Sequence, residues 1–75
     1  MSADTAREQL QAELAEVDSD LAGLRRSAAE ARDGVAEAED PTDRGALIRE
    51  ADEQDEIADQ LVARRETLVL RLADA

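Results

Sequence analysis

The chain has 75 residues, no aromatic side chain, no cysteine, no histidine, and a net charge of −11 from nine basic and 20 acidic side chains. A chain of this length buries only a small core, and without thiols or imidazoles it has no disulfide or ordinary zinc site, so we expect no cofactor and no metal. An acidic surface repels phosphate and anionic lipid, which argues against direct nucleic acid or membrane binding and favours a protein partner. No apolar run could span a bilayer and no signal peptide is recognisable, so we expect a cytoplasmic protein.

The first predicted helix covers residues from about 4 to 38, with Ser2, Asp4 or Thr5 as its N-cap. Its apolar residues recur at alternating steps of four and three, which is a heptad pattern. They are Leu10, Leu14, Val17, Leu21, Leu24, Ala28, Ala31, Val35 and Ala38. Gly34 lies off this stripe, and its low helix propensity predicts fraying near the helix end.

Residues 39–42 form the predicted tip, where the chain reverses. Asp40 suits an N-cap, Pro41 the first helical position and Asp43 the first turn, so the sequence favours a new helix start here. The second predicted helix runs from about 41 to 73 and repeats the same alternation. Its stripe consists of Leu47, Ala51, Gln54, Ala58, Leu61, Arg65, Leu68, Leu72 and Ala75.

The two stripes fit a single antiparallel register. The facing pairs are Leu14 with Leu68, Leu21 with Leu61, Leu24 with Ala58, Ala31 with Ala51, and Val35 with Leu47. The midpoint of every pair is residue 41, so the register that pairs the apolar residues also places the helix start at the bend. We predict an all-α fold with one domain over residues 1–75, a two-helix antiparallel coiled-coil hairpin with its turn near Asp40-Pro41.

Charged side chains beside the stripes should pair in the same register. The predicted pairs are Glu13 with Arg71, Asp20 with Arg64, and Arg25 with Asp55. Arg65 lies within the second stripe, and we expect its charge to reach the edge while its stem stays between the helices. The acidic side chains between residues 50 and 59 are explained by solvation, and the alternative is a patch for a basic protein surface.

Catalysis by this chain is not expected. There is no His, Cys or Lys and no glycine-rich phosphate loop, and the serines lack a base to activate them. Val62, Val69 and Leu70 add apolar surface outside the stripe, near the chain ends. Docking against another domain or packing against a second copy explains these three better than a ligand site, so a homodimer through this base is one expectation.

Asp40 and Asp43 have two explanations. Helix capping and first-turn electrostatics account for both carboxylates. The functional alternative is that the two acids, at the end of a long arm, reach into a cavity and meet a metal or basic groups.

The stretch from Asp40 to Ala46, Asp-Pro-Thr-Asp-Arg-Gly-Ala, resembles the tip motif of the DksA/TraR family of RNA polymerase regulators. That motif is Asp-x-x-Asp-x-Ala, often with Pro second and Arg fifth. The family carries it at the tip of an antiparallel coiled coil, which enters the secondary channel of RNA polymerase and modulates initiation near the catalytic magnesium. The resemblance implies that Asp40 and Asp43 are the functional acids of a partner-binding tip that includes Arg44 and Gly45.

The resemblance has two departures. Gly45 stands where the family has Ala, and the family's cysteine-containing zinc-binding part is not present in this sequence. The hairpin also resembles the N-terminal coiled coil of GreA-type transcript cleavage factors, which display acids at the tip and whose C-terminal domain is likewise not present.

We therefore expect a non-enzymatic protein-binding module. The resemblance implies a transcription regulator that inserts its acidic tip into the secondary channel of RNA polymerase. The alternative is a structural coiled-coil adaptor that self-associates through its base and binds a partner protein by its faces.

Overall fold

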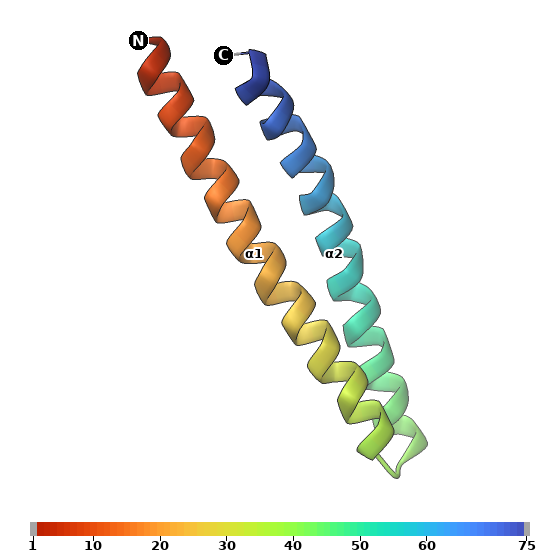
Figure 1. Ribbon diagram of the computed structural model, residues 1–75. Helices are drawn as coiled ribbons and strands as arrows, with labels where there is room; N and C mark the ends of the chain where they lie inside the picture. Colours follow the sequence, from red (N-terminus) through yellow and green to blue (C-terminus); the bar gives the residue numbers. More distant parts are fainter. Residues whose placement is uncertain (1, 75) are drawn as a thin grey trace.

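The computed structural model describes residues 2–74 as two long helices joined by a short turn. Helix α1 spans Ala3–Glu37 and helix α2 spans Pro41–Asp74. The helices pack antiparallel along their length, with both chain ends at one end of the molecule and the turn at the other (Figure 1). The rod is 57 Å long with a cross-section of 15 by 14 Å. The predicted all-α hairpin with its turn near Asp40-Pro41 is confirmed, and neither helix, over the described residues, has a stretch apolar enough to cross a membrane.

The ends of α1 are set by local hydrogen bonds. Ser2 is the N-cap: its backbone is extended and its hydroxyl accepts a hydrogen bond from the Thr5 N–H at 3.2 Å. The helix ends at Glu37 because the next residue, Ala38, is extended, with φ −72° and ψ 128°. The Ala38 N–H donates to the Gly34 carbonyl at 2.9 Å. The helix therefore continues one turn beyond Gly34, and the fraying expected there is not observed.

The seam between the helices is built from the predicted heptad positions. All six buried side chains among residues 2–74 belong to it: Leu21, Ala28, Ala31, Ala51, Ala58 and Leu68. Ala28, Ala31 and Ala51 form one cluster, with Leu47 packed against it. Alanine allows two helices to approach closely, and the three alanines of this cluster are buried, as Leu21 and Leu68 are. The predicted seam residue Ala75 lies outside the described residues.

Two seam positions carry polar side chains. Arg65 is exposed, and its Nε donates to Oδ1 of Asp18 at 2.6 Å, so its charge reaches the edge as expected. Gln54 is half-buried, and its Oε1 is the buried side-chain oxygen that has no hydrogen-bond partner within residues 2–74. A buried carbonyl without a partner costs about 1–3 kcal/mol. The Gln54 layer therefore weakens the seam in its middle.

The charged side chains beside the seam do not pair with the predicted partners. Arg64 donates to Glu13 at 2.7 Å, so the predicted pairs of Glu13 with Arg71 and of Asp20 with Arg64 are wrong. The observed partner of Glu13 lies one heptad away from the expected one, on the same edge of the seam. Long exposed side chains reach either neighbour, and such pairs differ little in free energy, so the heptad pattern alone does not select between them.

The glycines of α1 provide a matched test of helix packing. A Cβ at Gly23 would have no neighbour within 4 Å, whereas one at Gly34 would lie 3.2 Å from Cδ1 of Leu47. Gly23→Ala should raise the free energy of unfolding by about 1 kcal/mol through helix propensity. Gly34→Ala should gain clearly less, because Leu47 has to move. Chemical denaturation followed by circular dichroism measures both, and an equal gain for Gly34→Ala would show that the helices are not close at that layer.

Candidate functional site

The turn is organised by Asp40. Its Oδ1 accepts a hydrogen bond from the Thr42 N–H at 2.8 Å, and its carbonyl accepts one from the Arg44 N–H at 3.0 Å. Pro41 begins α2, where its missing N–H leaves no donor unsatisfied and its fixed φ suits the helix. Asp40 is therefore the N-cap of α2, and one oxygen of its carboxylate is used inside the turn.

Arg44, predicted as part of the partner-binding tip, folds back onto the end of α1. Its Nε donates to the Ala38 carbonyl at 2.7 Å and its Nη2 donates to the Glu39 carbonyl at 3.0 Å. Carbonyls after the last turn of a helix have no helical partner and carry partial negative charge, so a guanidinium satisfies them well. In this structure Arg44 joins the end of α1 to the start of α2. The heptad pattern gave no signal for this contact.

Asp43 is the tip acid that remains available. It lies in the first turn of α2, is exposed, and its carboxylate makes no hydrogen bond or ion pair with residues 2–74. Gly45 is half-buried, has no positive φ, and a Cβ there would meet nothing within 4 Å. The backbone therefore does not require glycine at this position, and the alanine of the resembled motif would fit.

The turn and the first half of α2 concentrate the negative charge. Residues 37–59 hold ten of the 20 acidic side chains and two of the nine basic ones. Such a field attracts cationic groups and falls off over about 10 Å at ordinary ionic strength. Across residues 2–74, no group of three or more carboxylates is arranged to hold a metal ion. The field of this segment therefore attracts basic groups.

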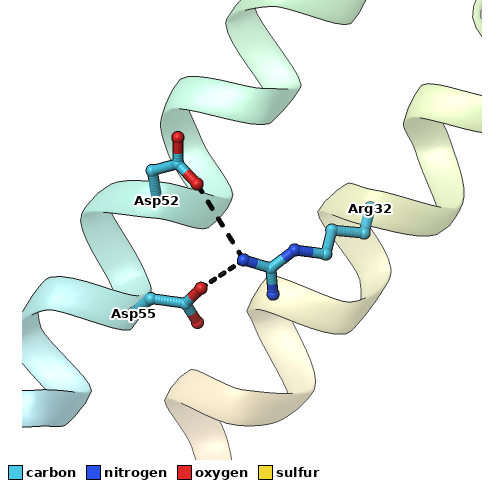
Figure 2. Close-up of polar contacts among 3 residues, drawn as sticks. All are labelled: Arg32, Asp52 and Asp55. Carbon is cyan, nitrogen blue, oxygen red and sulfur yellow. Dashed lines mark hydrogen bonds and ion pairs between the residues drawn. The ribbon is translucent and has the colours of Figure 1, made fainter.

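Arg32 forms ion pairs that link the two helices on the side of the rod toward the turn. Arg32 on α1 reaches across to α2, where it donates to Oδ2 of Asp55 and lies 3.9 Å from Oδ1 of Asp52 (Figure 2). The predicted pair of Arg25 with Asp55 is therefore wrong, again by one heptad. The hydrogen bond to Asp55 and the charge of Asp55 raise the pKa of the Arg32 guanidinium above its ordinary value, against a desolvation effect, and Asp52 adds to the rise. Asp52 and Asp55, two of the acidic side chains between residues 50 and 59, thus make contacts within the hairpin.

The base carries the predicted apolar surface. Val62 is half-buried, Val69 is 40% exposed and Leu70 is 67% exposed. Ile48 and Ile57 are also about half exposed and were not predicted. Ile48 lies near the turn and Ile57 in the middle of α2, and both occupy heptad positions next to the seam. Apolar residues at these two positions could have been recognised in the sequence as additional exposed apolar surface.

Comparison of the chain with family models, with curated proteins and with solved structures gave no match.

The contacts of Arg44 give a testable expectation for the tip. Arg44→Ala removes two hydrogen bonds to carbonyls at the end of α1 and should cost about 1 kcal/mol. Amide hydrogen exchange should then become faster at the turn, at Ala38 and Thr42, and stay unchanged near the chain ends. Arg49→Ala is the control, because Arg49 is an exposed arginine of the same helix without a bond to those carbonyls. Equal exchange in the two variants would mean that Arg44 does not stabilise the turn.

Proposed function

We propose that the chain is a non-enzymatic, cytoplasmic protein-binding module that presents the Asp43 carboxylate to a basic or cation-containing cavity of a partner protein. The observation that carries the proposal is the position of this carboxylate. It lies at the far end of a rod 57 Å long, exposed, while its neighbours Asp40 and Arg44 hold the turn. The helical turn fixes the backbone of Asp43, so only its short side chain has to be ordered when it meets a cation, which keeps the entropic cost of binding small.

RNA polymerase is the partner that we propose, and its secondary channel is the cavity. The support is the resemblance of residues 40–46 to the DksA/TraR tip motif, together with the antiparallel hairpin that carries it here. The rod is about 15 Å thick, so it is slender along its whole length. In this proposal Asp40 keeps the turn folded and Asp43 acts on the partner, so the two acids of the motif have different tasks.

The experiment is in vitro transcription with purified RNA polymerase and the full chain. Asp43→Asn removes one charge and should abolish a several-fold effect of the hairpin on transcript yield. Asp40→Asn keeps the N-cap, because Asn caps as well as Asp, and should have a smaller effect. Glu16→Gln, which removes one exposed charge from α1 near the base, is the matched control and should act like the unmodified chain. A hairpin without any effect on transcription, or an Asp43→Asn variant that acts like Glu16→Gln, contradicts the proposal.

The coiled-coil adaptor is the second candidate, and the exposure of Val69 and Leu70 favours it. An adaptor binds its partner through the sides of the rod, and the tip takes no part in binding. Capture of that partner by immobilised hairpin would then be unchanged by Asp43→Asn and lost on substitution of Leu70 by a charged residue.

A further inference from the structure

An open groove runs along one side of the seam at the base. Two adjoining stretches make it up: one is lined by Ala22, Arg25 and Val62, the other by Val69 and Leu70. The first stretch has a volume of about 540 Å³ and the second about 330 Å³. Arg65 and Glu66 line both stretches, and the second stretch lies on α2 alone. We call this surface the base groove.

Apolar side chains of α2 line the base groove next to charged ones. On α2, Val62 and Val69 occupy the same heptad position, and Leu70 follows at the position that points away from α1. On α1, Ala22 lines the groove and is exposed, at an outer heptad position that Asp18 and Arg25 separate from the seam. A helix of a two-stranded coiled coil needs only a narrow apolar stripe, whereas a helix of a four-helix bundle has a wider one. The stripe of α2, which Val62 and Val69 widen, therefore fits a helix that packs on one further pair.

The charges of the base groove are balanced, unlike those of the chain. Its lining holds two basic residues, Arg25 and Arg65, and two acidic ones, Asp18 and Glu66. A two-fold interface brings the same patch of both copies together, so the patch has to be complementary to itself. A chain with a net charge of −11 meets another copy most readily where its own surface is neutral. The base groove meets both conditions.

We propose that two copies of this chain associate through the base groove about a two-fold axis, with their tips pointing outward at opposite ends. Full overlap of the rods would place the acidic segment of residues 37–59 over the other copy, which is also net negative, so the contact is restricted to the bases. This arrangement leaves both Asp43 carboxylates accessible. The proposal does not depend on the function of the tip.

The contact between the two bases is small, which is typical of weak dimers. Half of a face 57 Å long and 15 Å wide corresponds to roughly 850 Å² for two copies, which is below the roughly 1,200 Å² at which stable specific interfaces begin and in the range of weak, transient ones. We therefore expect a concentration-dependent dimer with a dissociation constant of roughly 10–100 µM.

Sedimentation velocity of the full chain between about 5 and 500 µM tests the proposal. The unmodified chain of 8.1 kDa should shift toward twice that mass over this range. Leu70→Glu places a charge in the groove at a residue that is 67% exposed and should weaken dimerisation at least tenfold. Ile57→Glu is the matched control: Ile57 is 47% exposed but lines the opposite side of the seam with Ser19 and Gly23, so this variant should dimerise like the unmodified chain.

Circular dichroism of each sample separates loss of association from loss of folding. Should Leu70→Glu lose helicity, Leu70→Asn is measured in its place with the same expectation. A chain that is monomeric at 500 µM overturns the proposal. So does a Leu70 variant that remains helical and dimerises normally, and so does a dimer that Ile57→Glu disrupts instead.

Discussion

Leu68→Ala should lower the free energy of unfolding by about 3 kcal/mol, because Leu68 has no exposed surface in the seam and truncation of a buried leucine typically costs 2–5 kcal/mol. A chain of 75 residues has an unfolding free energy of roughly 4–11 kcal/mol. The variant should therefore lose a large part of its stability. Urea denaturation followed by circular dichroism, at a few micromolar protein, measures the change.

Leu70→Ala is the control, since it makes the same substitution two residues away at a side chain that is 67% exposed. At micromolar concentration its cost should stay below about 0.5 kcal/mol. Similar losses for the two variants would mean that Leu68 and Leu70 have comparable burial and that α2 is rotated relative to the described seam.

Gln54→Leu should raise the free energy of unfolding by about 1–2 kcal/mol. The substitution keeps the size of the side chain nearly unchanged and removes a buried carbonyl oxygen that has no hydrogen-bond partner among residues 2–74. In the predicted register Gln54 faces Ala28, which is buried, so an apolar side chain at position 54 should pack in the seam without a polar group left unpaired. Thermal and urea unfolding of the variant and of the unmodified chain give the difference.

The control for this substitution is Gln60→Leu, at an exposed position of the same helix. It should change stability by less than about 0.5 kcal/mol. A Gln54→Leu variant that is less stable than the unmodified chain would show that the Gln54 amide is hydrogen-bonded in solution. Polar residues at seam positions can also fix the register of a coiled coil, so the more stable variant should be checked for a change in its association state.

The fold was predictable from the heptad pattern because helix packing obeys a short repeat. A repeat fixes which side of each helix is apolar, and two repeats of equal phase fix a register with its midpoint at Pro41. Every buried side chain among residues 2–74 therefore falls on a predicted position. The position of the turn followed from the same argument, since Asp40 and Pro41 start a helix where the register requires one.

The partners of the exposed charges could not be predicted in the same way. Arg32 binds Asp55 where Arg25 was expected, and the alternatives differ only in the reach of flexible side chains in water. The contacts of Arg44 were also missed, because they depend on how the backbone leaves α1 at Ala38 and Glu39. At the candidate site, the motif indicated two acids, whereas their separate tasks became visible only from the hydrogen bonds of Asp40.

The position of Asp43 at the tip depends on the chain being one hairpin folded at Asp40-Pro41. The chain has no cysteine, so a pair of introduced cysteines reports on a single contact. Ala31→Cys/Ala51→Cys joins two members of one buried cluster, and Ala31→Cys/Ala58→Cys displaces the second cysteine by one heptad. Oxidation at low micromolar concentration should cross-link the first pair within one chain at least ten times faster than the second. Equal rates, or cross-links that form only between chains, would contradict the hairpin and with it the position of the tip.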